Sequence, residues 1–358
     1  PLLERALAIR EKALGSEHPE VANSLNGLAI LLMNRGSYAE ARPLYERSLA
    51  IREKSLGLEH PSVADSLNNL ALLLDDQGSY AEARPLYERA LAIFEKALGP
   101  EHPKMATALN NLAILLEKQG SYAEARPLYE RSLAIWEKAL GPEHPDVAAS
   151  LNNLALLLQD IGSYSEARPL YERSLAIREK ALGPEHPDVA ESLNNLAVLL
   201  DAMGSYAEAQ PLYERALVIG EKSLGPEHPN VARILGDLAV LLSNMGSYAE
   251  ARPLYERALA IFENAYGPEH PDVALSLSNL ALLLLRQGIY SEAWPLFERA
   301  LAIREKAFGP EHLDVALSLN NLAGLLQTQG SYAEARPLFE RALAIQEKAL
   351  GPEHLDVA

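Results

Sequence analysis

The sequence contains no cysteine, which excludes disulfide bonds and thiolate metal sites. This absence does not fix the compartment, and a cytoplasmic location is our expectation. The chain also lacks an Asn-x-Ser/Thr sequon and any long hydrophobic run. No apolar run exceeds the six residues from Leu280 to Leu285, whereas a helix that spans a bilayer needs about 20. We therefore expect no membrane-spanning segment.

Basic residues are scarce relative to acidic ones. The chain has 32 Lys and Arg against 49 Asp and Glu, which gives a formal net charge of −17. Nucleic acids and anionic membranes both favour clustered Lys and Arg. The charge therefore argues against either as a partner, and we expect a protein or a peptide instead.

The histidines reveal what the chain does contain, which is a repeat. Each of the nine follows the last at one fixed interval: His18, His60, His102, His144, His186, His228, His270, His312 and His354. A fixed period of this length, about 42 residues, indicates an array in which each repeat contacts mainly its neighbours. It outweighs the two or three domains that length alone suggests. We expect a single array over residues 1–358, about eight and a half repeats, and a fragment of a longer chain because no capping repeat is recognisable.

One repeat, residues 57–98, predicts two helices, which we name A and B. Helix A has apolar residues at helical spacing: Val63, Leu67, Leu70, Ala71 and Leu74. It should begin near His60, because Pro61 suits the first helical position. It should end at Gly78 in a left-handed cap.

Helix B is predicted to follow at once and to run to about Leu98. Ser79, with Glu82 three residues later, has the pattern of a capping box. Its buried side carries Ala83, Tyr87, Ala90 and Leu91. Pro85 lies near the helix start, where it should bend the first turn rather than break the helix. We predict eight complete A–B hairpins and no β-strand.

The repeat resembles the tetratricopeptide family. The residues that carry the likeness are Leu70-Ala71, Gly78, Tyr80, Ala83, Tyr87 and Ala90. The usual tetratricopeptide repeat is shorter, with about 34 residues. The extension "AIREKALGPEHPDVA" is similar to the light chain of kinesin and to bacterial proteins with repeats of that type. The resemblance implies an all-α, right-handed α-solenoid of helix–turn–helix repeats, with helix A lining a concave groove. It says less about function, because the family binds many partners.

The repeated histidine has three possible roles: metal ligand, acid–base group, or part of a turn. A metal site needs several ligands within about 2 Å of one ion. Equivalent residues of stacked repeats lie roughly 8–10 Å apart. A catalytic role needs a partner group, and no Ser/His/Asp or Cys/His arrangement is suggested. We therefore expect each histidine to cap helix A, and we expect no metal, no cofactor and no enzyme activity.

One face of helix A varies between repeats, and we call it the A face. It consists of the positions equivalent to Asp65, Asn68, Asn69, Leu72, Asp75 and Asp76. The exposed face of helix B keeps Glu82, Glu88 and Arg89 in every full copy. A drifting surface should vary on both helices. The contrast favours a binding face with its own specificity, although drift on a solvated surface remains the alternative.

Paired asparagines recur on the A face. They are Asn68-Asn69, Asn110-Asn111, Asn152-Asn153, Asn194-Asn195 and Asn320-Asn321. Asparagine is a poor helix former, so a pair in mid-helix needs a reason. One reason is that an amide can hold the backbone of an extended peptide, which is also the role of groove asparagines in kinesin-light-chain-type repeats. The other is a hydrogen bond to the neighbouring repeat. The pair becomes Gly236-Asp237 in one repeat, which should bind differently.

The charges on the A face suggest the partner. The candidate residues are the carboxylates Asp65, Asp75, Asp76, Glu117, Asp160, Glu191 and Asp201, the asparagines Asn68, Asn69, Asn110, Asn111, Asn152, Asn153, Asn194 and Asn195, and the leucines Leu275, Leu282 and Leu285. The early repeats are acidic and the late ones apolar. We expect a partner with a basic segment followed by an apolar anchor. The alternative is a structural role, in which the array self-associates end to end into a fibre.

Three aromatic residues share one position on helix B. Phe94, Trp136 and Phe262 are equivalent to Arg52 and Arg178. Packing between repeats is the expected role for these aromatic side chains, in preference to a binding cage.

Overall fold

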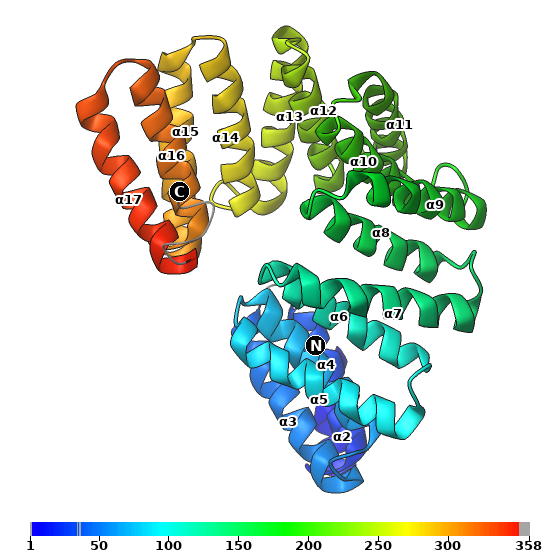
Figure 1. Cartoon of the computed structure of the whole chain (residues 1–358). Coiled ribbons are helices and arrows are strands. Elements are labelled where there is room, and N and C mark those ends of the chain that lie inside the picture. The colour runs from blue at the N-terminus through cyan, green and yellow to red at the C-terminus, as the bar shows by residue number, and fades with distance from the viewer. Residues whose placement is uncertain (1, 34, 36, 351–358) are drawn as a thin grey trace. The chain divides into compact units, whose positions relative to one another are not determined.

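The computed structural model describes residues 2–33, 35 and 37–350, so the predicted cap at His354 lies outside the described residues. The described residues form 17 helices and no β-strand (Figure 1). The helices are α1 (Leu2–Leu14), α2 (Pro19–Met33), α3 (Tyr38–Leu56), α4 (Pro61–Asp76), α5 (Tyr80–Leu98), α6 (Pro103–Lys118), α7 (Tyr122–Leu140), α8 (Pro145–Asp160), α9 (Tyr164–Leu182), α10 (Pro187–Ala202), α11 (Tyr206–Leu224), α12 (Pro229–Asn244), α13 (Tyr248–Tyr266), α14 (Pro271–Arg286), α15 (Tyr290–Phe308), α16 (Leu313–Thr328) and α17 (Tyr332–Leu350).

The helices fall into two compact units, residues 1–181 and 182–358. From α2 onwards, each even-numbered helix is an A helix that packs against the B helix after it, as Figure 1 shows for each pair. The result is eight A–B hairpins, from α2–α3 to α16–α17. The predicted all-α solenoid of helix–turn–helix repeats is therefore confirmed.

The turn inside each hairpin depends on a glycine. In the second hairpin, α4 ends at Asp76 and Gly78 takes a left-handed conformation with φ of 72°. The backbone N–H of Ser79 then donates to the carbonyl of Leu74 at 2.8 Å, which satisfies one of the last free carbonyls of the helix. The predicted left-handed cap is correct.

The predicted capping box at the start of helix B is wrong. The side chain of Ser79 makes no capping hydrogen bond, because its backbone, at φ −82° and ψ 55°, is not in the extended conformation that such caps use. The carbonyl of Ser79 instead accepts hydrogen bonds from the N–H groups of Glu82 and Ala83, both at 3.1 Å. Glu82 turns outward, and its Oε2 accepts from Nη2 of Arg42 in the preceding repeat at 2.8 Å.

Helix B tolerates its proline as predicted. Helix α5 has 19 residues and continues through Pro85 without interruption. Proline lacks an N–H, but its position in the second turn means that only one early helical hydrogen bond is lost. The bend expected at this point stays a prediction.

The core lies inside and between hairpins. Five of the residues that carry the family resemblance are buried: Leu70, Ala71, Ala83, Tyr87 and Ala90 are at most 6% exposed. Between repeats, Val63, Phe94 and Met105 join one apolar cluster that spans α4, α5 and α6. Burying one large apolar side chain contributes about 1.5–3 kcal/mol, so contacts with the neighbouring hairpins supply much of the stability of each repeat.

Candidate functional site

The repeated histidine is a helix cap. In His144, the ring Nδ1 accepts a hydrogen bond from the backbone N–H of Asp146 at 3.2 Å, and the backbone is extended at φ −78° and ψ 143°. The other described copies make the same bond at 3.1–3.2 Å: His18, His60, His102, His186, His228, His270 and His312. The interpretation as a turn is confirmed for these eight residues. Among the described residues, no group of three or more His, Asp or Glu side chains is placed to hold a metal ion.

The asparagines of the A face form hydrogen bonds between repeats. Asn153 Nδ2 donates to Asn110 Oδ1 at 2.9 Å. The same bond joins Asn111 to Asn68 at 3.2 Å and Asn69 to Asn26 at 3.0 Å. Of the two roles that the sequence left open, the structure therefore shows the hydrogen bond to the neighbouring repeat in the first unit.

The Gly236-Asp237 repeat reverses this bond. An aspartate carboxylate can only accept, and here Asn194 Nδ2 donates to Asp237 Oδ2 at 2.8 Å. Burial raises the pKa of Asp237, while the hydrogen bond from Asn194 and the charge of Arg233 oppose the rise. The missing side chain at Gly236 leaves a pocket of about 320 Å³ beside it, which is also lined by Phe262, Tyr266 and Leu275 among others. The hydrogen bond of this repeat therefore differs from those of the first unit, and the expectation that the repeat binds differently stays a prediction.

Two of the predicted carboxylates are already paired inside the first unit. Asp75 is 3% exposed, and its Oδ2 lies 3.0 Å from Lys118 Nζ. Asp65 Oδ2 lies 2.7 Å from Lys104 Nζ, which also sits 5.7 Å above the centre of the Phe94 ring. Lys104 was not among the predicted residues, although the sequence places it just three positions before Thr107, the equivalent of Asp65 in the next repeat.

Other carboxylates of the first unit lie close to buried tyrosines or remain free. Glu117 Oε2 accepts a hydrogen bond from the Tyr129 hydroxyl at 2.7 Å, and burial raises the pKa of Glu117 in spite of that bond. Burial also raises the pKa of Asp76 and of Asp160. Neither of these two carboxylates makes a hydrogen bond or an ion pair with any described residue, and both are exposed.

In the second unit the A face becomes more apolar. Burial raises the pKa of Asp201, while a hydrogen bond from Asn244 Nδ2 at 3.3 Å opposes the rise. Leu275 is 52% exposed and its equivalent in the next repeat, Leu317, is 51% exposed. The remaining predicted residues of this unit are half-buried or buried: Glu191, Asn194, Asn195, Leu282 and Leu285.

The aromatic residues of helix B have the packing role that was expected of them. Phe94 is 2% exposed and belongs to the core between repeats, and Trp136 packs against two such clusters. Packing is therefore confirmed. However, Phe94, Trp136 and Phe262 each also line a pocket between successive A helices.

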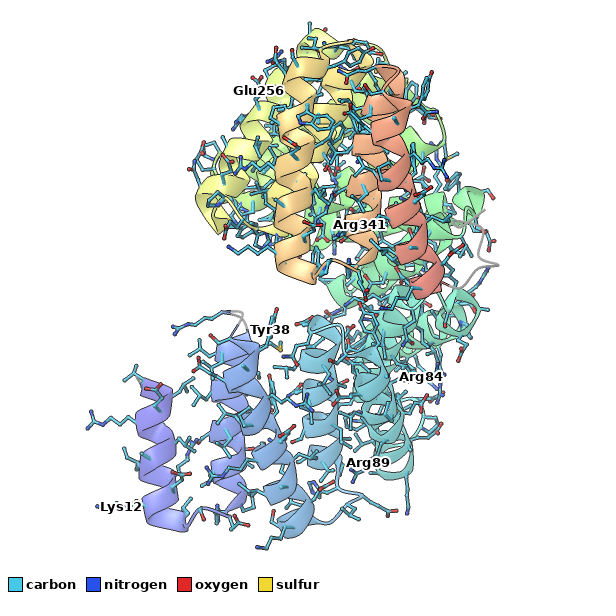
Figure 2. The ribbon with its side chains drawn as sticks, turned by 90° about the vertical axis from the view of Figure 1, so that its left-hand side faces the viewer. Lys12, Tyr38, Arg84, Arg89, Glu256 and Arg341 are labelled. Atoms are coloured by element: carbon cyan, nitrogen blue, oxygen red, sulfur yellow. The ribbon has the colours of Figure 1, made fainter. Side chains whose placement is uncertain are left out.

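The constant charges of helix B have a structural cause that the sequence comparison missed. Figure 2 labels the side chains of Arg84 and Arg89. Arg84 Nε lies 2.9 Å from Glu88 Oε1, and its Nη2 lies 2.8 Å from Glu124 Oε2 of the next repeat. Arg89 Nη2 lies 2.7 Å from Glu53 Oε1 of the preceding repeat. These side chains are constrained by ion pairs between repeats. The position of Arg84 is Gln210 and Trp294 in two repeats, so the ion pairs account for part of the constancy and weaken it as support for a specific binding face on helix A.

Comparisons with known proteins agree with this architecture. A family model described as the tetratricopeptide repeat matches residues 1–54, 21–96, 64–138, 104–180, 146–219, 188–249, 238–306, 279–348 and 314–358. It describes a structural repeat and not a catalytic family. Among curated proteins, no relative matches the chain. No helix in the described part of the chain is both long enough and apolar enough to cross a membrane.

Three solved structures illustrate the likeness. A structure described as a Podosopora anserina kinesin light chain with nearly identical TPR-like repeats is 35% identical, with a TM-score of 0.50; the match covers 57% of this chain and 97% of that one. BtubC (BKLC) from P. vanneervenii is 26% identical, with a TM-score of 0.52 and coverage of 67% and 93%. The quorum sensor NprR from B. thuringiensis shares the fold alone, at 14% identity, a TM-score of 0.66 and coverage of 96% and 92%. With its family model matched along the whole sequence and its helices paired as that family requires, the chain belongs to the tetratricopeptide-repeat family.

Proposed function

We propose that this protein is an interaction scaffold whose A face binds an extended peptide or protein segment. The first unit binds a basic part of that segment, and the second unit binds an apolar anchor. Such a scaffold needs no cofactor and no catalytic group. The partner is a protein or peptide rather than nucleic acid or a membrane, because the net charge of −17 disfavours both of the latter.

The observation that carries the proposal is the pair of free carboxylates on the A face of the first unit. Asp76 and Asp160 make no ion pair with a described residue, whereas Asp75 is neutralised by Lys118. Burial raises the pKa of both carboxyls, and the charge of Lys118 opposes the rise for Asp76, so on balance the surroundings disfavour the charged forms. A cation from a partner would stabilise the charged forms. Its Coulomb interaction with such a carboxylate would be stronger than with a fully hydrated carboxylate.

The apolar part of the proposal rests on the second unit. Single exposed leucines are normal on a protein surface. Here, however, Leu275 and Leu317 occupy the same position in two successive repeats, where the earlier repeats carry polar residues such as Asp65. Leu282 and Leu285 continue the apolar surface along the A face, although both are half-buried.

A peptide-display library selected on the whole chain tests the proposal. We expect the selected peptides to be enriched in Lys and Arg, with apolar residues after them. The double variant Asp76→Asn/Asp160→Asn should weaken their binding at about 50 mM salt and have little effect near 1 M, where the Debye length falls to about 3 Å. The variant Leu275→Ser/Leu317→Ser should weaken binding at both salt concentrations.

The matched control is Glu88→Gln/Glu130→Gln, which removes the same charge from helix B and should leave binding unchanged. Selected peptides that are rich in Asp and Glu would contradict the proposal. Light scattering addresses the alternative, since assemblies that lengthen with concentration would favour a fibre formed end to end.

A further inference from the structure

Two pockets between successive A helices of the first unit are lined by equivalent positions of the repeat. In the pocket of about 380 Å³ between α4 and α6, the Phe94 ring contributes an aromatic wall. The ammonium group of Lys104, from α6, lies 5.7 Å from the ring centre. Asp65, from α4, holds that ammonium at 2.7 Å. The protein thus places one of its own cations between an aromatic face and a carboxylate.

The next pocket has the same plan without the cation. It lies between α6 and α8, has a volume of about 180 Å³, and is lined by Thr107, Asn110, Trp136, Asp146, Ala149, Ser150 and Asn153. A shift of one repeat places Trp136 where Phe94 was, Asp146 where Lys104 was, and Thr107 where Asp65 was. We call it the Trp136 pocket. It retains the aromatic side chain and a carboxylate, and none of its lining residues is Lys or Arg.

The carboxylate of this pocket is available. The Asp146 side chain is 56% exposed, and its Oδ2 lies 3.5 Å from His144 Nδ1. That Nδ1 accepts a hydrogen bond from the backbone N–H of Asp146. Trp136 is half-buried, which leaves part of its ring accessible. Asn110 and Asn153 bond to each other across the pocket and bring it onto the A face.

We propose that the Trp136 pocket binds a single Lys or Arg side chain of the partner. The cation lies against the Trp136 ring and pairs with Asp146, as Lys104 does with Phe94 and Asp65. Tryptophan is the strongest aromatic partner for a cation. A volume of about 180 Å³ suits one side chain rather than a larger ligand. This inference rests on the proposed function and assigns one position of the basic segment.

Fluorescence of Trp136 gives a direct readout. The chain has two tryptophans, and Trp294→Phe leaves Trp136 as the single reporter. Titration of this single-tryptophan protein with a nine-residue arginine peptide should change the emission in a saturable way. A nine-residue glutamate peptide should not change it.

Variants copied from other repeats of the chain test the pocket, with affinity measured on a labelled arginine peptide. Trp136→Arg introduces the residue that other repeats have at this position. There, Arg52 donates a hydrogen bond to the hydroxyl of Ser66 at 2.7 Å, and Arg304 donates one to the hydroxyl of Ser318 at 2.6 Å. Ser150 is equivalent to both serines, so the variant should fold, and the new arginine should occupy the pocket. Affinity for the peptide should fall about 2- to 30-fold, the equivalent of 0.5–2 kcal/mol.

Three further variants change the carboxylates. Thr107→Asp restores the equivalent of Asp65 and should raise the affinity several-fold. The double variant Thr107→Asp/Asp146→Lys rebuilds the Asp65–Lys104 pair and should lower the affinity below that of the wild type. Asp146→Asn, which copies Asn230, should also lower it and serves if Trp136→Arg fails to fold.

The outcomes separate this inference from the proposed function. If Trp136→Arg and Asp146→Asn bind the peptide as tightly as the wild type while Asp76→Asn/Asp160→Asn binds more weakly, the pocket assignment is overturned and the scaffold proposal stands. If the wild type does not bind the arginine peptide at all, both fail. Loss of affinity in the pocket variants, with a gain in Thr107→Asp, supports the assignment.

Discussion

The side-chain Nδ2 of Asn153 donates a hydrogen bond to the side-chain Oδ1 of Asn110, 2.9 Å away in the preceding repeat. An amide carries both a donor and an acceptor, so either partner can be reversed. The Asn194–Asp237 pair shows the reversed form, with the donor in the earlier repeat and a carboxylate in the later one. The bond therefore requires one amide, and its direction is free.

Three Asn→Asp variants test whether the direction of this hydrogen bond can be reversed. Asn153→Asp should be tolerated because Asn110 can turn its amide and donate, and Asn110→Asp should be tolerated because Asn153 already donates. Each should change the free energy of unfolding by about 1 kcal/mol or less. The double variant places two carboxylates face to face and should lose about 2–3 kcal/mol more than the sum of the single changes. Urea denaturation measures all three, and additive effects would mean that the two side chains do not interact.

The buried tyrosines of helix B provide a second matched pair. The Tyr129 hydroxyl donates to Glu117 at 2.7 Å, whereas the Tyr87 hydroxyl is buried with no hydrogen-bond partner among the described residues. Tyr129→Phe should destabilise the protein by about 1.5–3 kcal/mol, the worth of a hydrogen bond to a charged group. Tyr87→Phe should be neutral or stabilising. Equal losses in thermal or urea unfolding would show that the hydroxyl of Tyr129 contributes nothing specific.

Glu117 also predicts a pH dependence. Burial raises its folded pKa above the ordinary value of 4.5, so the folded protein binds more protons than the unfolded chain between those two values. Its contribution to stability is therefore fully present below pH 4.5 and is lost as the pH rises through the folded pKa. Glu117→Gln keeps a hydrogen-bond acceptor, as Gln159 does for Tyr171 at 3.3 Å.

We therefore expect Glu117→Gln to be more stable than the wild type at pH 7. The difference should shrink as the pH falls towards 4.5. Unfolding curves of both proteins at several pH values measure it. A constant difference across this range would show that the carboxyl of Glu117 does not titrate differently in the folded state.

Because the histidines cap helices, the stability of the protein should tolerate asparagine in place of a capping histidine and should not depend on a metal ion. His144→Asn should be nearly neutral because asparagine is a good N-cap, whereas His144→Ala should cost about 1 kcal/mol. Dialysis against a chelator should leave the melting temperature unchanged, since Nδ1 of each described cap is already used by a backbone N–H. A fall of several degrees after dialysis would make metal binding the better explanation of the histidines.

Much of the fold could be predicted because the chain repeats itself. The fixed period, Gly78 and Pro61 together place both helices of a hairpin, and all three signals can be read directly from the sequence. The failures concern geometry that a local pattern does not contain. The capping box at Ser79 failed because it depends on one backbone torsion.

The relationships between repeats could not be predicted from one repeat alone. The bond from Asn153 to Asn110 and the pair of Asp65 and Lys104 each join residues of successive A helices. Both depend on how far those helices are shifted along each other, which the packing of whole hairpins determines. For this reason the sequence placed Asp65 and Asp75 on a binding face without showing that each already has a cationic partner.

The final prediction concerns a position of helix B where one repeat has a small residue and its partner on the following helix A is large, whereas other repeats have the reverse. Gly220 occupies the position of Arg52, and Ile234, on the following helix A, occupies that of Ser66. A Cβ at Gly220 would meet Ile234 Cδ1 and Val231 Cγ2 at 3.4 Å, which is ordinary contact. Because glycine inside a helix is about 0.5–1 kcal/mol less stable than alanine, Gly220→Ala should stabilise the protein by about that amount.

Gly220→Arg should have the opposite effect, since the guanidinium group would have to displace the buried Ile234 side chain, which stands where Arg52 finds the hydroxyl of Ser66. A loss of about 2–4 kcal/mol is expected. Adding Ile234→Ser recreates the pair of Arg52 and Ser66, which bond at 2.7 Å, and should recover most of that loss. Urea unfolding of the single and double variants measures this coupling, because a second change that merely removed apolar surface would lower the stability further. Recovery would show that the residue at this position of helix B and its partner on the following helix A are chosen as a pair.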